Sequence, residues 1–333
     1  MKEKNVRQVL KALPNYLKEH YWSDGMVRVA GREYSGLLVT PCHTHDDQSR
    51  QMSCISCHAL HQPVEDPRSL AAWANDQLGV GMETNQACIQ CHEDFVSDEQ
   101  LQAHTHHAPG SVGSLCYNCH MPYTTFGLLK AIRSDAIDSP NVQTSLNTGR
   151  PNACNQCHLD KTLAWTAEQL WTRYDIRQPE LTPDQQIVAA SILWTLSGDA
   201  GQRALMAWSM NWSAAHEAMI NSEKPVRTSW MLPYLSELMK DPYPAVRFLA
   251  EERLVSFTGL EDVEYDFLAP ESERNEKSGQ VWEIWETNFS EEGRSLHDDS
   301  RGPLLLDSEG ALKMETLNRL LENRDHTVIN LQE

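Results

Sequence analysis

Four copies of one short pattern, CxxCH, constrain the first half of this chain more than any other feature. They take up eight of the nine cysteines and are CISCH at 54–58, CIQCH at 88–92, CYNCH at 116–120 and CNQCH at 154–158. A CxxC pair alone is compatible with a zinc site or with a redox dithiol. Histidine accounts for only 14 of the 333 residues, yet it follows the second cysteine in all four copies. That regularity is typical of covalent haem attachment, and neither zinc binding nor thiol chemistry requires it.

The spacing predicts a role for each motif residue. Each cysteine sulfur adds to one vinyl group of a porphyrin, and the adjacent histidine then lies under the iron as its axial ligand. We therefore predict four haem c groups, whose axial ligands are His58, His92, His120 and His158. The thioether anchors are the paired cysteines Cys54, Cys57, Cys88, Cys91, Cys116, Cys119, Cys154 and Cys157. Cys42 has no partner motif and is expected to be a small, buried apolar residue.

Seven further histidines precede residue 158 and could supply the sixth ligand of each iron. Six of them gather near the motifs, which favours ligation: His43, His45, His61, His104, His106 and His107. His61 follows His58 by only three residues, so we expect it to ligate a neighbouring haem rather than the iron of His58. His20 lies apart from the motifs and is not expected to bind iron.

Four segments carry a family resemblance: CISCHALH, NQACIQCH, HTHHAPGSVGSLCYNCHMP and TGRPNACNQCHLDKTLAW. Through them, residues 35–175 resemble multihaem c-type cytochromes with doubled CxxCH motifs, which are related to the cytochrome c554-like group and are often joined to helical repeats. The resemblance implies a periplasmic or extracellular electron carrier in which two histidines hold most of the irons. It also supports His61, His106 and His107 as ligands.

The chain departs from that family at one position. In many relatives an Arg-Asp-His or Arg-Ser-His element follows the third motif, and its histidine resembles a sixth ligand. Here the matching run is Arg133-Ser134-Asp135. One haem then lacks its usual ligand, or it receives water, another histidine such as His43, or a ligand from a second chain. The alternative is that Asp135 is a surface substitution without effect and that a different histidine is the sixth ligand of this haem.

Helical patterns begin near residue 162. Thr182-Pro183-Asp184-Gln185 predicts a helix start with a capping box and proline at the first position. Ile187, Ala190 and Trp194 continue at helical spacing, and Gly198 suits the end. Asp199 and Asp241 begin two similar stretches that lie 42 residues apart, which is within the period of HEAT-type repeats.

The remaining sequence is acidic and less regular. Residues 258–310 show poor periodicity, with Trp282 and Trp285 in an expected helix, and residues 311–331 predict a last helix and a strand-like end. The predicted fold class is therefore mainly α. It comprises a loop-rich tetrahaem cytochrome c domain over residues 1–160 and a helical, HEAT-like domain with an acidic C-terminal region over residues 161–333.

Charge limits the possible partners. The net charge is −19, and residues 251–333 hold 21 acidic and 8 basic residues. Such acidity argues against nucleic acid and permits docking to a basic redox partner, including another multihaem cytochrome. The sequence does not decide whether the protein forms a homo-oligomer or a larger assembly.

Two absences bear on where the protein acts. No run of 18 apolar residues occurs, so no transmembrane segment is predicted. Residues 1–20 contain no export signal. Because haem c is attached outside the cytoplasm, we expect an upstream segment in the precursor of a periplasmic or extracellular protein.

Electron transfer is the leading functional prediction, because no catalytic triad, phosphate loop or nucleotide fingerprint stands out. The alternative is a reductase of a small nitrogen or sulfur oxyanion or of a peroxide, acting at one haem with an open sixth position. Asp135 could then deliver protons. Whether the protein is an enzyme stays open at this point.

Overall fold

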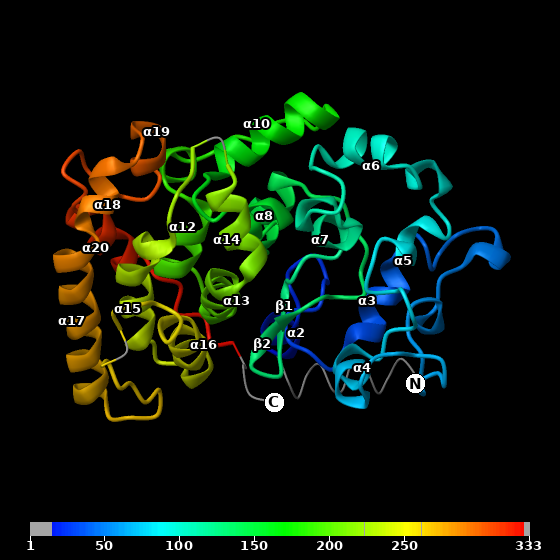
Figure 1. Cartoon of the computed structure of the whole chain (residues 1–333), viewed down its shortest axis with the longest axis horizontal. Coiled ribbons are helices and arrows are strands. Elements are labelled where there is room, and N and C mark those ends of the chain that lie inside the picture. The colour runs from blue at the N-terminus through cyan, green and yellow to red at the C-terminus, as the bar shows by residue number, and fades with distance from the viewer. Residues whose placement is uncertain (1–14, 223, 261, 330–333) are drawn as a thin grey trace. The chain divides into compact units, whose positions relative to one another are not determined.

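The computed structural model describes residues 15–222, 224–260 and 262–329 and is mainly helical (Figure 1). The chain folds into two compact units. The loop-rich unit comprises Arg32–Pro122 and Ser134–Ser139, and the helical unit comprises Met1–Gly31, Tyr123–Arg133 and Pro140–Glu333. The first three CxxCH motifs belong to the loop-rich unit and the fourth to the helical unit. The expected domain boundary at residue 160 stays a prediction.

The loop-rich unit is built from short helical segments, none longer than eight residues. Pro41, Pro63, Pro67, Gly79 and Gly81 punctuate it, and such residues end helices or initiate turns. Its elements are α3 (Glu33–Val39), η1 (Gln48–Arg50), η2 (Cys54–Ser56), α4 (Leu70–Asp76), α5 (Gln86–Ile89), η3 (Glu93–Phe95), α6 (Asp98–Thr105), η4 (Val112–Ser114) and α7 (Cys116–His120).

The first described segments of the helical unit form a short helix and a small hairpin. Strands β1 (Thr125–Gly127) and β2 (Lys130–Ile132) pair antiparallel, with Phe126 opposite Ala131, and Val29 forms a bridge to Phe126. Phe126 and Ala131 are buried, so the hairpin contributes to the core. The helices of this first part are α2 (Tyr16–His20), α8 (Val142–Thr148), α9 (Ala153–Cys157) and α10 (Leu163–Tyr174).

The centre of the helical unit is a set of packed helices. Helix α13 packs against α12 and α16, and α15 packs against α16 and α17. Leu196, Leu205, Met206, Met210 and Leu235 are fully buried between them. The helices are α11 (Pro183–Ile187), α12 (Ala190–Leu196), α13 (Ala200–Asn211), α14 (Ser213–Ile220), η5 (Thr228–Met231), α15 (Leu232–Met239), α16 (Pro244–Leu254) and α17 (Glu271–Asn288).

The predicted helix start at Thr182 is confirmed, but the helix does not continue to Gly198. Thr182 and Gln185 form the capping box and Pro183 occupies the first position. Helix α11 ends at Ile187, because Val188 and Ala189 are fully buried in an extended stretch. The Ala189 N–H donates to Pro303 O at 2.9 Å, and Ala189 forms a bridge to Thr162. These tertiary bonds replace the helical ones, and a second helix, α12, starts at Ala190.

The two aspartates of the expected repeats have different structural roles. Asp199 is the N-cap of α13 and forms a capping box with Gln202. Asp241 is fully buried and pairs with Arg203 of α13 through Nε–Oδ2 at 2.6 Å and Nη2–Oδ1 at 3.2 Å. The loop before α16 is thereby tied to α13. Assignment to the HEAT family of repeats stays a proposal.

Within the described residues, three helices follow α17: α18 (Ser290–Ser295), α19 (Asp298–Arg301) and α20 (Met314–Glu322). The predictions of a helix at Trp282 and Trp285 and of a last helix are confirmed by α17 and α20. Residues 323–329 form no strand, and residues 330–331 of the expected strand-like end lie outside the described residues.

Candidate functional site

Each CxxCH motif folds as a single helical turn. The backbone N–H of the histidine donates to the carbonyl of the first cysteine, at 2.9 Å for His58, 3.0 Å for His92 and 2.8 Å for His158. The third motif is helix α7 itself. Residues four apart lie on the same face of a helix. The first sulfur and the imidazole of each motif can therefore face one ligand.

The cysteines of these motifs do not form disulfides. No disulfide joins any of the nine cysteines, and Cys54 and Cys91 are exposed while the others are half-buried. Cys42 is also half-buried, so the expectation of a buried apolar residue is wrong. Burial and, to a lesser degree, the charge of Cys91 raise the pKa of the Cys42 thiol. Nowhere in residues 15–222, 224–260 and 262–329 do three or more His, Cys, Asp or Glu side chains converge as a metal-binding group.

One asparagine side chain connects the second motif to the third. Asn85, which caps α5, donates through Nδ2 to Ser114 O at 2.9 Å, and its Oδ1 accepts from Cys116 N at 2.9 Å. The thiols of the first cysteines of the two motifs, Cys88 and Cys116, lie close enough to shift each other's pKa. Their interaction lowers the pKa of the Cys116 thiol to about 7, and the same interaction together with burial raises the pKa of Cys88. The Asn85 side chain thus holds the two motifs next to each other.

Four histidines of the loop-rich unit are held through Nδ1 by a backbone carbonyl. The acceptors are Asp76 O for His58 (3.0 Å), Asp138 O for His120 (2.8 Å), Met52 O for His43 (2.7 Å) and Thr105 O for His107 (2.7 Å). A carbonyl only accepts, so the proton is on Nδ1 and the lone pair of Nε2 is directed elsewhere. Histidines that bind a metal usually show this arrangement.

His45 does not share this arrangement. Its Nδ1 accepts a hydrogen bond from the backbone N–H of Asp47 at 3.0 Å, so the proton of the neutral ring is on Nε2. The structure therefore distinguishes His43, whose ring is oriented as a ligand would be, from His45, although the sequence gives both equal weight.

His104 lies beside a motif histidine. The ring centroids of His104 and His120 are 6.1 Å apart and their planes differ by 7°. Two imidazoles that bind one metal ion from opposite sides have ring centres roughly 6 Å apart, because each metal–nitrogen bond is about 2 Å. Burial, and then the charges of His120 and His106, lower the pKa of His104 and favour its neutral form, the form that binds metals.

The other two histidines of this segment differ sharply in their environments. His107 packs against Gly113, where an added Cβ would lie 2.2 Å from Cδ2 of the ring. Only glycine at position 113 leaves enough space for the His107 ring. His106 is exposed and adopts a left-handed conformation, with φ of 57°, where it ends α6. His61 and His92 are exposed as well.

Asp135 lies close enough to His58 and Cys57 of the first motif for its charge to act on both. The Thr40 hydroxyl donates to Asp135 O at 3.0 Å and accepts from Ile137 N at 3.0 Å. Gly36 of α3 allows this contact, because a Cβ there would be 2.8 Å from Ala136 N. Burial raises the pKa of the Asp135 carboxyl, and the charge of His58 acts in the opposite direction. The Asp135 charge in turn contributes, after burial, to the raised pKa of Cys57.

The fourth motif is anchored within the helical unit by the two residues between its cysteines. Asn155 is fully buried and bonds to Lys161 O (3.0 Å) and to the Thr166 hydroxyl (2.8 Å). Gln156 exchanges two hydrogen bonds with the backbone of Tyr123, at 3.1 and 2.7 Å. The turn that carries His158 is therefore fixed by the protein itself.

Sequence reasoning missed the residues that support the motifs. Asp76 and Asp138 act through backbone carbonyls, which every residue type possesses, so no sequence signal marks them. His20 also shares the histidine arrangement, because its ring is buried and its Nδ1 lies 2.8 Å from Tyr16 O. The sequence signal that could have indicated this hydrogen bond is the four-residue spacing of Tyr16 and His20, which places the two residues on one face of a helix.

Residues 72–159 match the profile of the family described as cytochrome c7 and related cytochrome c. This range contains the second, third and fourth CxxCH motifs, and the first lies before it. No curated protein and no solved structure matches the chain. The family match supports a multihaem c-type cytochrome that binds haem c covalently and acts in electron transfer with redox partners. Within the described part of the chain, no helix has the length and apolar character that a membrane crossing requires.

Proposed function

We propose that this protein carries electrons along four covalently bound haem c groups, one at each CxxCH motif. The observation that carries the proposal is the turn shared by all four motifs, which puts a cysteine sulfur and an imidazole on one face. The family match to residues 72–159 supports three of the four sites. When bound, each haem supplies one iron that alternates between the ferrous and ferric states.

The chain's own residues orient the axial ligands. The carbonyls of Asp76 and Asp138 accept the Nδ1 protons of His58 and His120, which fixes the orientation of the rings and leaves Nε2 as the ligating atom. We assign His104 as the partner of His120 on the same iron, on the ring separation of 6.1 Å. His43 and His107 are further sixth ligands, supported by their carbonyl-bound Nδ1 atoms. His61 and His106 stay candidates from the family resemblance.

For the fourth motif we propose His20 as the sixth ligand. His20 belongs to the helical unit, as His158 does. Two residues after His20, Trp22 donates to Thr124 O at 2.9 Å, and the neighbouring Tyr123 is bonded to Gln156 inside the motif. His216 is a poor alternative, because its Nε2 donates to Met210 O at 2.7 Å. The assignment predicts that His20→Ala converts one haem from low spin to high spin.

The number of haems is tested by intact mass. The mature protein should carry the mass of four haems, and a Cys154→Ala, Cys157→Ala variant should carry three. Cys42→Ala is the matched control and should keep all four. Fewer than four haems in the unaltered protein would contradict the proposal.

A haem-based reductase is the second candidate, and the position of Asp135 is the observation that favours it. A half-buried acid beside His58 and Cys57 could deliver protons to a substrate at an iron with an open sixth position. Carbon monoxide binding by the ferrous protein separates the two functions. The carrier should show none, whereas the reductase should bind it at one haem and lose it in Asp135→His.

The setting of the protein follows from the chemistry of haem attachment. We propose that it acts in the periplasm or outside the cell and exchanges electrons with other redox proteins. The helical unit, which we assign to HEAT-like repeats, would then offer a docking surface. Haem staining of periplasmic and cytoplasmic fractions tests the location.

A further inference from the structure

A phenyl ring lies against the His104 imidazole in the loop-rich unit. The ring centroids of Phe95 and His104 are 4.6 Å apart, and the two ring planes are inclined by 38°. Aromatic rings attract one another at centroid separations of about 4.5–7 Å, and they prefer offset or tilted arrangements to a face-to-face one. The contact therefore favours one orientation of the His104 ring over the others.

The second CxxCH motif fixes the position of Phe95. Phe95 is the last residue of η3, and its backbone N–H donates to His92 O at 3.1 Å. Two residues later Ser97 caps α6, because its side chain accepts from Gln100 N at 3.2 Å. The phenyl ring thus belongs to a short segment that is bonded to the second motif at one end and continues at the other into the helix that carries His104.

His104 shares one face of α6 with the buried residues of that helix. Leu101 and Thr105 are 7% and 8% exposed. Residues three and four apart lie on one face of a helix, and His104 follows Leu101 by three. The half-buried imidazole therefore lies on the side of α6 that faces the rest of the loop-rich unit, and η3 packs against the same helix.

The two imidazoles that we assign to one iron have nearly parallel planes. The planes of His104 and His120 differ by 7° at a centroid separation of 6.1 Å. Nδ1 of His120 lies 2.8 Å from Asp138 O, which orients that ring. The carbonyl at one ring and the phenyl group at the other therefore both contribute to the parallel arrangement.

We propose that Phe95 is a positioning residue that holds the His104 imidazole parallel to that of His120. The inference rests on the proposed function and on the assignment of both histidines to the third haem. Phe95 is neither a motif residue nor a ligand, and it acts through its contact with His104. Because Phe95 is bonded to His92 O, the turn of the second motif then helps to orient a ligand of the third.

Electron paramagnetic resonance of the ferric, haem-loaded full chain reports the orientation of the two rings. Each imidazole π system splits the iron d orbitals along its own direction, so parallel planes reinforce the splitting and perpendicular planes cancel it. Parallel rings give a rhombic low-spin signal, whereas rotated rings give one with a larger g maximum. His104→Ala identifies the signal of the third haem, because that haem should become high-spin and its low-spin signal should disappear.

Phe95→Leu keeps an apolar side chain and removes the flat ring. We expect the signal of the third haem to fall to roughly half of its intensity or less, as the loss of one aromatic contact allows. A low-spin signal with a larger g maximum should replace it, because His104 is still present. Phe95→Tyr keeps the flat ring and should retain the original signal.

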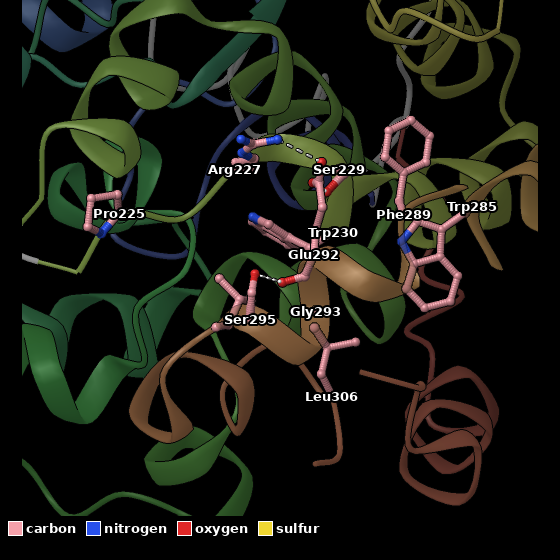
Figure 2. A pocket seen from close by; sticks show the side chains of 11 residues that line it. Pro225, Arg227, Ser229, Trp230, Trp285, Phe289, Glu292, Gly293, Ser295 and Leu306 are labelled. Carbon is pink, nitrogen blue, oxygen red and sulfur yellow. Dashed lines mark hydrogen bonds and ion pairs between the residues drawn. The ribbon is translucent and has the colours of Figure 1, made fainter. Parts of the chain in front are cut away.

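Phe289→Leu is the matched control. Phe289 is also half-buried, and it lines a pocket of the helical unit together with Trp285 and Leu306 (Figure 2); no histidine is among the residues that line this pocket. This variant should leave every haem signal unchanged. Four haems by intact mass with an unchanged signal in Phe95→Leu, or with no high-spin haem in His104→Ala, would overturn the inference. Fewer than four haems in the unaltered protein would instead contradict the electron-transfer proposal.

Discussion

Gly113 leaves the His107 ring in place because it has no side chain. A Cβ at this position would lie 2.2 Å from Cδ2 and 2.5 Å from Cγ of the ring. We expect Gly113→Ala to displace His107 and to cost about 1–3 kcal/mol of unfolding free energy, as overpacking does. If His107 binds iron, one haem also becomes high-spin. The checks are thermal unfolding and the carbon monoxide difference spectrum of the ferrous protein.

Gly79→Ala is the control for this prediction. Gly79 lies in the same unit, and a Cβ there would meet only the Met82 side chain at 3.4 Å and Cys57 O at 3.6 Å, which are ordinary contacts. Its spectrum should not change. A Gly113→Ala protein with unaltered spectrum and stability would show that His107 is neither confined by Gly113 nor a ligand.

At this scale the sequence predicted which residue types carry the chemistry but not how they are oriented. The CxxCH spacing implies one turn of helix, and the structure has that turn in all four motifs. It could not separate His43 from His45, because the difference lies in whether Nδ1 meets a carbonyl or an N–H. Nor could it place Asp135 near His58, since Thr40 and Gly36, which are distant in sequence, position the backbone of Asp135.

Helix α13 and the loop before α16 depend on the buried pair of Arg203 and Asp241. Their side chains are 2% and 0% exposed. Removing Arg203 leaves the buried Asp241 charge with only the more distant Arg324, at 3.9 Å, as an ion-pair partner within the described residues, so Arg203→Met should lower the unfolding free energy by about 3–5 kcal/mol. Denaturant unfolding monitored by far-ultraviolet circular dichroism measures it.

A double variant shows whether this cost comes from the orphaned charge. Arg203→Met combined with Asp241→Leu removes both charges and should be less destabilised than the sum of the single variants. Simple additivity of the two single changes would contradict the coupling inferred from the 2.6 Å contact.

Helix α20 is attached to the start of α11 by a two-pronged ion pair. Arg319 donates to both carboxylate oxygens of Asp184, at 2.8 and 2.7 Å, and lowers the pKa of that carboxyl from 3.8. The stabilisation is complete above the unfolded pKa of 3.8 and is lost as the pH falls through the lower folded-state value.

Asp184→Asn should therefore cost about 0.2–1 kcal/mol at pH 7, the range of exposed ion pairs. The difference from the unaltered protein should vanish in strong acid. Unfolding curves at pH 7 and below pH 3 measure both values, since about pH 3 lies under the ordinary carboxyl range. A difference that grows in acid would contradict the direction of the pKa shift.

Local patterns predicted helix starts better than helix lengths. The capping box at Thr182 depends on residues three apart, so the sequence contains it fully. The interruption at Val188 and Ala189 depends on Pro303 and Thr162, which are distant in sequence. The helical spacing of apolar residues does not change at such a break, so it predicts one continuous helix.

The whole molecule has a net charge of −19, with 21 acidic and 8 basic residues after position 250. Charge of one sign steers a partner of the opposite sign, and salt screens that attraction. We expect the rate of electron exchange with a small basic c-type cytochrome to fall at least about tenfold between low salt and about 1 M salt. Stopped-flow absorbance measures the rate, and with an acidic cytochrome it should rise instead.

The sequence predicts a change of domain near residue 160, and that division stays a prediction. What the sequence could not predict is the set of hydrogen bonds that holds the fourth motif in the helical unit, which involves Asn155, Gln156 and Tyr123. Tyr123 and Gln156 come from segments that are far apart in the chain. Composition does not encode such bonds.

The Asn85 side chain has a consequence for the speed of electron flow. Electron tunnelling weakens steeply with distance, so the separation of two carriers sets its rate. From its position just ahead of Cys88, Asn85 bonds to Ser114 O and to the backbone N–H of Cys116, so the anchoring cysteines of the two motifs are held close together. If carriers are attached at those cysteines, the hydrogen bonds of one amide group would limit how far the two carriers can separate, and so how slow the tunnelling step between them can become.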